Sequence, residues 1–310
     1  MKKPFTLKSR KSKSLNGIIF VPSDKSISIR ALIISSLCLG NSKIFNLLES
    51  EDVKHTLKSL KELGVKILKK KKYYEVYGEG GLYKKPKKRL YLGNSGTGVR
   101  LITGLLASRG LNITLVGDDS LSSRPMKRII EPLELMNLTV QSKKGCLPLK
   151  IVNKNKVPIP IDYNLKIGSA QIKSAILLAS TNIKGTTTIL EKFPSRNHTE
   201  IMLKFFGADI NKKGKKITIN SPNFLKPKDL IIPGDFSSAA FLIVATLITK
   251  NSKLKIQEVG LNFYRTGLLD VLNKMKAKIL ITNKKILNGE LVGDIEVLSS
   301  KLISTSVSKQ

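Results

Sequence analysis

A repeat of about 70 residues is the feature that most constrains how this chain can fold. Four segments share one pattern, in which an amphipathic helix ends and a charged hairpin follows. These segments are residues 55–67, 130–140, 199–210 and 268–279. The residues that end the four predicted helices are Gly64, Asn137, Gly207 and Lys276. Gly and Asn tolerate the left-handed conformation that closes a helix, and a generic alternation of helices and strands predicts no such regular recurrence.

The half of each repeat that precedes these helices also aligns. Each copy has a small or polar loop, an apolar helix, a short connector and a β-branched strand. A further loop follows each strand, and three of these loops carry an arginine: Arg124, Arg196 and Arg265. The predicted unit is therefore helix, strand, helix and hairpin. One unit cannot bury its apolar helix alone, so we expect the units to pack around one another.

The charge is strongly positive, with 55 Lys and Arg against 22 Asp and Glu and a net charge of +33. Such a balance raises nucleic acid as a partner. The lysines, however, are dispersed along the whole chain, there is no Trp, and aromatic residues make up 5%. No zinc-finger, basic-zipper or aromatic RNA-binding signature is present. We favour a lysine-biased surface, keep nucleic-acid binding as a lesser alternative, and treat small anionic ligands as a compatible cause.

The remaining composition excludes several classes of protein. Cys38 and Cys146 cannot build a disulfide framework or a cysteine-rich zinc site, and no cluster has metal-ligand spacing. The longest apolar run, residues 239–249, is too short to span a membrane, and the start of the chain lacks a hydrophobic signal segment. We therefore expect a cytoplasmic α/β protein with no membrane partner and no metal.

The starts of the apolar helices carry the residues with chemical interest. A helix N-terminus offers unpaired N–H groups and a positive dipole end, which suit phosphate or carboxylate. Lys25, Ser26 and Arg30 surround the first such end, and Ser26 is the predicted cap of the helix. Gly96 and Gly98 lie in a glycine-rich loop that permits close approach of backbone to a ligand, although the loop is not a Walker A motif.

Two arginine loops complete this set. Arg124 lies just before a helix, and Arg196 repeats the arrangement. A planar guanidinium can bind a carboxylate or phosphate through two hydrogen bonds. The neighbouring His198 is interpreted as a satisfied loop histidine rather than a general base. The residues by themselves therefore predict a repeat protein that gathers cations and hydroxyls around a doubly anionic small ligand.

Seven motifs in order carry a resemblance to the 5-enolpyruvylshikimate-3-phosphate synthase (3-phosphoshikimate 1-carboxyvinyltransferase) family. They are PSDKSISIRA (22–31), LGNSGTGVR (92–100), LSSRPM (121–126), SAQIKSA (169–175), SRNHTE (195–200), PGDFSSAAF (233–241) and VGLNFYRTG (259–267). The resemblance implies an enolpyruvyl transferase fold of two lobes, an inside-out α/β barrel with three βαβαββ units in each lobe. It predicts a complete lobe at 22–232, and an incomplete second lobe formed by 1–21 and 233–310.

The resemblance also implies the reaction and its site. The enolpyruvyl group of phosphoenolpyruvate would pass to the 5-hydroxyl of shikimate 3-phosphate, with release of phosphate, on the route to chorismate and the aromatic amino acids. The resemblance implies that no metal or organic cofactor is needed. Lys25 would be the catalytic residue that touches both substrates. The implied binding residues are Ser26 and Arg30 for shikimate 3-phosphate, Gly96 and Arg124 for phosphoenolpyruvate, and Ser169, Ala170, Gln171, Ser195 and Arg196 around the phosphate of shikimate 3-phosphate.

Two departures from the family pattern bear on these expectations. Ile29 stands where the family usually has His or Asn. The family's catalytic aspartate, its Lys-Glu pair and its later phosphoenolpyruvate-binding arginines lie beyond the Ser299-Ser300 motif, with no counterpart here. We therefore predict a C-terminally truncated member with little turnover alone, although members of full length are usually monomeric. Three hypotheses stay open: a synthase completed by a C-terminal polypeptide, an inactive remnant that binds shikimate 3-phosphate, and a basic nucleic-acid binder.

Overall fold

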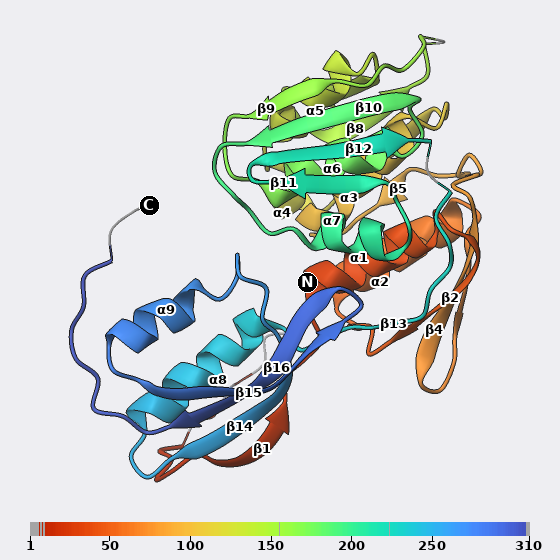
Figure 1. Ribbon diagram of the computed structural model, residues 1–310. Helices are drawn as coiled ribbons and strands as arrows, with labels where there is room; N and C mark the ends of the chain where they lie inside the picture. Colours follow the sequence, from red (N-terminus) through yellow and green to blue (C-terminus); the bar gives the residue numbers. More distant parts are fainter. Residues whose placement is uncertain (1–5, 7, 9, 155, 223, 308–310) are drawn as a thin grey trace. The chain divides into compact units, whose positions relative to one another are not determined.

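The computed structural model describes residues 6, 8, 10–154, 156–222 and 224–307 (Figure 1). The chain divides into two compact units. The larger unit comprises residues 23–233 and 286–290, and the smaller unit comprises residues 1–22, 234–285 and 291–310. Across the described residues the strands form four sheets of four strands each.

The larger unit contains three copies of a βαβαββ unit. The first copy is β13 (Leu230–Ile231), α1 (Lys25–Ser35), β2 (Leu39–Phe45), α2 (Glu51–Glu62), β3 (Lys66–Lys69) and β4 (Tyr73–Glu79). The second is β5 (Leu90–Tyr91), α3 (Gly96–Ala107), β6 (Ile113–Val116), the short α4 (Asp119–Ser122), α5 (Lys127–Leu135), β7 (Thr139–Lys143) and β8 (Cys146–Val152). The third is β9 (Asp162–Leu165), α6 (Ala170–Ser180), β10 (Gly185–Glu191), α7 (His198–Phe205), β11 (Ile210–Lys213) and β12 (Lys216–Ser221).

The smaller unit contains one copy of the same unit, except for residues 286–290 at the turn of its hairpin, which belong to the larger unit. It comprises β1 (Asn16–Phe20), α8 (Phe236–Ile248), β14 (Lys253–Gly260), α9 (Gly267–Lys274), β15 (Lys278–Leu287) and β16 (Glu290–Leu298). Its strand order, β1-β14-β16-β15, matches β13-β2-β4-β3, β5-β6-β8-β7 and β9-β10-β12-β11 in the larger unit. In every sheet the first strand pairs parallel to the second, and the remaining pairs are antiparallel.

The strand that completes the first copy comes from far along the chain. β13 lies at residues 230–231 and pairs parallel with β2, with Leu230 opposite Ile44. β1 lies near the start of the chain and pairs parallel with β14, with Ile19 opposite Ile256. The chain therefore leaves one repeat after its first strand and returns to it much later.

The four predicted helix ends have the same backbone geometry. Gly64, Asn137, Gly207 and Lys276 have φ angles of 94°, 61°, 93° and 61°. Each lies directly after the helix cap, where a positive φ redirects the chain into the hairpin. The predicted repeat is thus confirmed, including the two copies in which Asn or Lys adopts the left-handed conformation in place of Gly.

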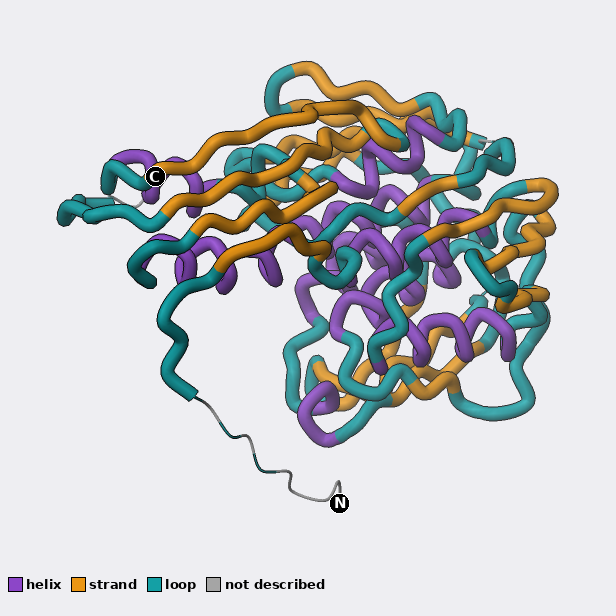
Figure 2. The backbone as a smooth tube through the Cα atoms, turned by 90° about the horizontal axis from the view of Figure 1, so that it is seen from below, coloured by secondary structure: helices purple, strands orange, loops and turns teal. Residues whose placement is uncertain are grey.

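Helices α1, α3 and α6 form the interior of the larger unit, and the sheets lie outside them (Figure 2). Nearly every residue of these helices is buried, which explains why their sequences are apolar on all faces. The closest approach is between α3 and α6 at Gly104. A Cβ on this glycine would lie 2.3 Å from the carbonyl oxygen of Ala175.

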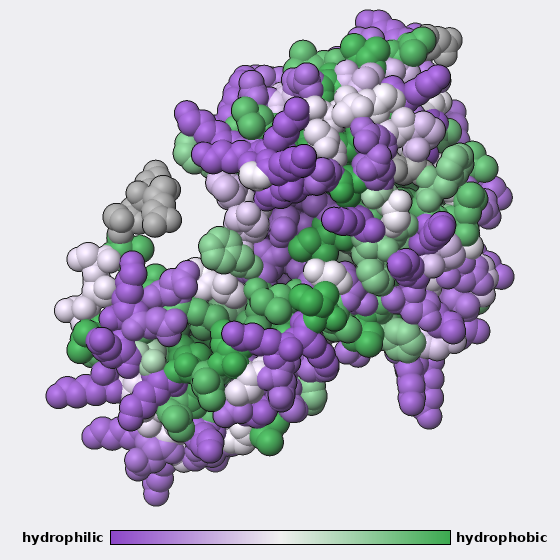
Figure 3. Space-filling view, in the orientation of Figure 1, coloured by the Kyte–Doolittle hydropathy of each residue, from purple (hydrophilic) through white to green (hydrophobic). Residues whose placement is uncertain are grey.

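Helix α8 is the equivalent helix of the smaller unit, but it is buried on one face only. Phe236, Ala239 and Ile243 are buried, whereas Phe241 is 81% exposed and Ile248 is 68% exposed. Figure 3 shows hydrophobic surface on the visible face of this unit. Among the described residues, no helix is long and apolar enough to cross a membrane.

Candidate active site

The ten residues predicted to bind substrate all belong to the larger unit. They lie at the starts of α1, α3 and α6 and in the loops that follow β6 and β10. The three helices pack against one another in the order α1, α3, α6. The repeat therefore gathers helix N-termini from three copies of one unit.

The cap of α1 is Asp24, and the prediction that Ser26 caps this helix was wrong. The Asp24 carboxylate accepts a hydrogen bond from the Ile27 backbone N–H at 2.8 Å. Asp24 has the extended backbone that an N-cap needs, whereas Ser26 already lies within the first turn. Lys25 is 47% exposed, and its Nζ lies 2.8 Å from the Asp52 carboxylate at the start of α2.

Arg30 is buried, with 3% of its surface exposed. Its Nε donates to the Thr199 hydroxyl at 2.7 Å, and its Nη2 donates to the Ser174 hydroxyl at 3.1 Å. Burial lowers the pKa of Arg30 to about 10, against the opposing effect of nearby carboxylates led by Asp24. The side chain stays charged at neutral pH and joins α1 to α6 and α7, so packing accounts for part of its hydrogen bonding.

The glycine-rich loop at the start of α3 brings two guanidinium groups close to the backbone. Ser95 caps the helix by accepting from the Gly98 N–H at 3.1 Å. A Cβ on Gly96 would lie 3.0 Å from Nη1 of Arg124 and 3.1 Å from Nη1 of Arg100. Any larger residue at 96 would push these cations away, which gives the glycine a physical role.

Arg100 is a residue of this site to which the sequence reasoning gave no role. Its Nη1 donates to the Gln171 side-chain oxygen at 2.8 Å, and Gln171 donates to the Thr97 hydroxyl at 3.2 Å. Burial first, and then the charges of Arg128 and Arg124, lower the pKa of Arg100 to about 10. Three arginines thus concentrate positive charge beside Gln171. Arg100 follows Gly96 by one helical turn, and that spacing was the available signal.

The start of α6 and the loop after β10 hold the remaining predicted residues. Ser169 caps α6 by accepting from the Ile172 N–H at 3.4 Å, and Ala170 is the first, buried residue of the helix. Ser195 and Arg196 lie in the loop that links β10 to α7. The Arg196 side chain is exposed, whereas Ser195 is half-buried and faces inward.

The arginine loops keep one arrangement in different repeats. Arg124 donates to the side-chain oxygen of Asn94, directly before the cap of α3. In the smaller unit, Arg265 makes an ion pair of 2.8 Å with Asp235, the cap of α8. Each of these arginines therefore returns to the start of the apolar helix in its own repeat.

His198 and Glu290 form a buried pair. His198 is buried, and its Nδ1 lies 2.6 Å from a carboxylate oxygen of Glu290. Its other ring nitrogen, Nε2, is buried without a hydrogen-bond partner in the described part of the chain, and His198 is the first residue of α7, so the interpretation as a satisfied loop histidine is only partly right. Among the described residues, no group of three or more His, Cys, Asp or Glu side chains is placed to hold a metal ion.

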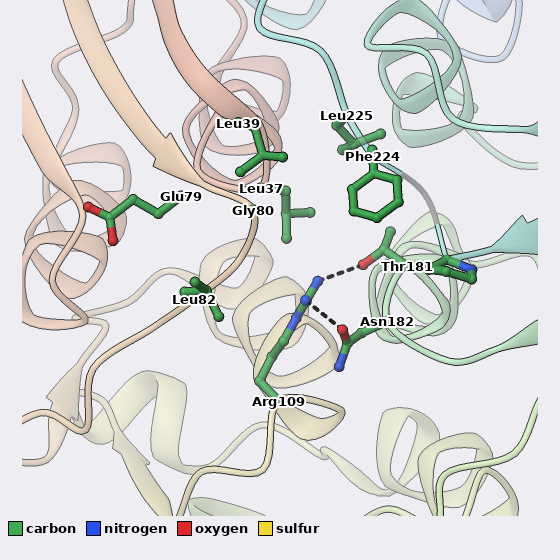
Figure 4. Close-up of a pocket in the computed structure, with 11 residues that line it drawn as sticks. Leu37, Leu39, Glu79, Gly80, Leu82, Arg109, Thr181, Asn182, Phe224 and Leu225 are labelled. Atoms are coloured by element: carbon green, nitrogen blue, oxygen red, sulfur yellow. Dashed lines mark hydrogen bonds between the residues drawn. The ribbon is translucent and has the colours of Figure 1, made fainter.

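A separate cavity of about 260 Å³ lies elsewhere in the larger unit (Figure 4). Its walls are largely apolar, and Arg109 lies at one side with its guanidinium bonded to Thr181 and Asn182. None of the ten predicted residues lines it. Because apolar side chains dominate its walls and Arg109 is the single cation among the described residues that line it, it does not suit a small ligand with two anionic groups.

The sequence and the fold both have clear relatives. The family model described as EPSP synthase (3-phosphoshikimate 1-carboxyvinyltransferase) matches residues 9–303. A 3-phosphoshikimate 1-carboxyvinyltransferase from Oceanobacillus iheyensis is 44% identical over 300 residues, which is 96% of this chain and 69% of the relative. One from Thermoanaerobacter sp. (strain X514) is 43% identical over 293 residues, which is 94% of this chain and 69% of the relative.

A solved structure gives the same result. The structure of EPSP synthase from Acinetobacter baumannii superposes with a TM-score of 0.87 at 37% sequence identity. The match covers 94% of this chain and 66% of that chain. The chain thus spans about two thirds of the length of the relatives that it matches.

Proposed function

The chain belongs to the EPSP synthase (3-phosphoshikimate 1-carboxyvinyltransferase) family, and we propose that its residues serve the reaction of that family. This reaction transfers the enolpyruvyl group of phosphoenolpyruvate to the 5-hydroxyl of shikimate 3-phosphate and releases phosphate. It belongs to the biosynthesis of chorismate and the aromatic amino acids, and we place it in the cytoplasm. The family assignment gives no support to the nucleic-acid hypothesis.

One observation carries the assignment of the site. Three helix N-termini and four arginines come together in one unit, and each helix is capped by a side chain rather than left open. The four arginines are Arg30, Arg100, Arg124 and Arg196. Helix N-termini and guanidinium groups both favour phosphate and carboxylate. Two substrates that each carry a phosphate and a carboxylate match this concentration of positive charge.

We assign phosphoenolpyruvate to the start of α3. Gly96 would present its backbone N–H, and Arg124 would bind a phosphate or carboxylate beside it. Arg100 supports this assignment because its buried charge lies next to Arg124 and holds Gln171. Lys25 would reach both substrates from the start of α1, where its exposed side chain makes an ion pair with Asp52 at the surface.

We assign shikimate 3-phosphate to the space bordered by α1, α6 and the loop after β10. Ser26 and Arg30 would contribute from α1, and Ser169, Ala170 and Gln171 from α6. Arg196 would contribute its guanidinium from the loop. Charges and dipoles fixed in advance in this way stabilise a transition state without further rearrangement, and orienting two substrates adds a second contribution.

We also propose that full turnover needs a further polypeptide segment that packs on α8. The resemblance assigns proton transfer to carboxylate and lysine side chains that have no counterpart in residues 1–310. In the larger unit, two other repeats cover each helix equivalent to α8, whereas Phe241 and Ile248 of α8 are largely exposed. A polypeptide with the same kind of repeat would bury Phe241 and Ile248 and supply the carboxylate and lysine side chains.

Calorimetry on the whole chain tests the binding part of the proposal. Shikimate 3-phosphate should bind alone, and phosphoenolpyruvate should bind once it is present. Arg124→Ala should weaken the second event and leave the first unchanged, while Arg89→Ala, at an exposed arginine, serves as the matched control. Absence of binding by the wild-type chain would contradict the proposed function.

Turnover measurements test the need for a further segment. The chain alone should release little or no phosphate from the two substrates. Adding a polypeptide that corresponds to the unmatched third of a relative should restore release. Turnover by the isolated chain at the rate of a full-length relative would show that the further segment is unnecessary.

A further inference from the structure

A buried cluster of charged side chains lies beneath the loop that carries Ser195 and Arg196. Lys173 of α6 and Glu191 at the end of β10 are 0% and 1% exposed, with 2.8 Å between Nζ and Oε1. The same Nζ lies 2.8 Å from Oε1 of Glu200 on α7, which is 7% exposed. One ammonium group therefore joins three elements of the third repeat, and nothing in the reaction assigned above uses it.

Glu191 holds Ser195 through two hydrogen bonds at a single oxygen. The Ser195 backbone N–H and its hydroxyl both donate to Oε1 of Glu191, at 2.8 Å and 2.5 Å. The Ser195 hydroxyl therefore donates its proton to the carboxylate oxygen of Glu191. This proton is then unavailable to a phosphate in the neighbouring site.

Two lysine ammonium groups lie close to the Glu191 carboxylate. Lys173 contacts Oε1, and Nζ of Lys212 lies 3.7 Å from Oε2. A buried ion pair of this kind is costly to break, because removal of one partner leaves the other charge buried and uncompensated. Lys173 also donates to the Ser195 carbonyl at 3.4 Å. The Ser195 peptide is thus held on its N–H side by Glu191 and on its carbonyl side by Lys173.

Lys173 also lies one turn into the helix whose start borders the predicted phosphate site. Ser169 caps α6, and Gln171 lies two residues before Lys173. The same lysine therefore connects the N-terminus of α6 to the loop at Ser195 and Arg196. Fixing these two parts relative to each other before the ligand arrives reduces the ordering cost of binding.

We propose that Lys173 and Glu191 are positioning residues that hold the Ser195 loop so that Arg196 binds the phosphate of shikimate 3-phosphate. In this proposal Ser195 anchors the loop and does not donate its hydroxyl to the phosphate. The inference rests on the proposed function for the identity of the ligand, and it revises the role given to Ser195 by the family resemblance.

Hydrogen exchange on the ligand-free chain tests the anchoring part. The Ser195 amide should exchange at least about tenfold faster in Lys173→Met and in Glu191→Gln than in the wild type. Lys192→Met is the matched control, because Lys192 is exposed in the same loop. Unchanged exchange in a folded variant would overturn the anchoring. If Lys173→Met does not fold, Glu191→Gln decides the question.

Calorimetry with shikimate 3-phosphate tests the positioning part through a double-mutant cycle. Lys173→Met and Ser195→Ala should each weaken binding about tenfold in the wild-type background and have little effect in an Arg196→Ala background. The losses of binding free energy in Ser195→Ala and Arg196→Ala could instead add in full in the double variant. That result would show that Ser195 contacts the phosphate directly. Such additivity would overturn the proposal for Ser195, and additive losses of Lys173→Met would overturn it for Lys173.

The two kinds of failure can be distinguished. A wild-type chain that does not bind shikimate 3-phosphate contradicts the proposed function and the ligand named here. Exchange of the Ser195 amide still reports on the anchoring in that case, because it needs no ligand. A wild-type chain that binds while Lys173→Met and Glu191→Gln bind equally well overturns the positioning role alone.

Discussion

Replacing Gly104 by alanine should force α3 and α6 apart. The added Cβ would lie 2.3 Å from the carbonyl oxygen and 2.5 Å from the Cα of Ala175, whereas an ordinary contact begins at 3.4 Å. Both atoms belong to the backbone of α6, so neither can turn aside. The two helices must separate by about 1 Å to admit the methyl group, in a region where close packing leaves little slack.

The cost of this separation can be set against the gain in helix propensity. Overpacking of a buried site costs about 1–3 kcal/mol, and the backbone contact places this site at the upper end. Alanine is better than glycine within a helix by about 1 kcal/mol. We therefore expect Gly104→Ala to lower the free energy of unfolding by about 2 kcal/mol.

The same shift should reach the candidate site. Arg100 and Gln171 lie one turn before Gly104 and Ala175 on the same two helices, and their hydrogen bond is 2.8 Å long. A separation of about 1 Å would break this bond, because donor and acceptor would exceed hydrogen-bonding distance. Binding of phosphoenolpyruvate in the presence of shikimate 3-phosphate should weaken together with stability.

Urea unfolding followed by circular dichroism measures the first effect. The midpoint should fall with an unchanged slope, since the surface exposed on unfolding stays the same. Gly267→Ala is the matched control, because Gly267 begins α9 and a Cβ there meets nothing within 4 Å. This control should keep or raise the midpoint. A midpoint for Gly104→Ala equal to that of the wild type would refute the steric argument.

Three further predictions follow from single features of the fold. Asp24→Ala removes the cap of α1 and should lower the free energy of unfolding by about 1 kcal/mol, measured by urea midpoints. Burial raises the pKa of the Cys38 thiol to about 12. In the unfolded chain the same thiol ionises from about pH 8.5. Above that pH the free energy of unfolding should therefore fall by up to about 1.4 kcal/mol per pH unit. Urea midpoints at pH 8, 9 and 10 should show a shallower decline for Cys38→Ala, and an identical decline would contradict the assignment. Phe241→Ser combined with Ile248→Ser should reduce self-association in sedimentation velocity more than Leu82→Ser, an exposed site in the other unit.

The repeat could be predicted because its signals are local. Each helix end needs a residue that accepts a left-handed conformation. Gly64 and Asn137 are of the residue types that do so, and they can be recognised without knowledge of the rest of the fold. The apolar helices were equally visible, since α1, α3 and α6 are apolar on every face. Each copy then adopts the same strand order, because a hairpin and the strand before it can pair with one another in only a few ways.

The contacts of the site could not be predicted because they join distant parts of the chain. Arg30 has its partners on α6 and α7, at Ser174 and Thr199, and no spacing in the sequence indicates such a pairing. The cap of α1 was misassigned between Asp24 and Ser26, two neighbours that both suit the role by residue type. Lys173 and Glu191 were missed since a lysine in an apolar helix shows no partner until the fold brings one.

The positive charge of the chain separates into two sets in the structure. The chain has 22 acidic residues and 55 basic ones, and several of the acidic residues are buried in the fold. Those buried are Asp24, Glu191, Glu200, Glu290 and Asp294. Glu191 and Glu200 are paired with the buried Lys173, so they do not offset the positive charge of the lysines at the surface. This excess of positive charge raises the local concentration of a phosphorylated substrate and is weakened by salt, whereas the buried Arg100 beside Gln171 is held at fixed geometry and is screened far less. High salt should therefore slow association with shikimate 3-phosphate more than it speeds dissociation.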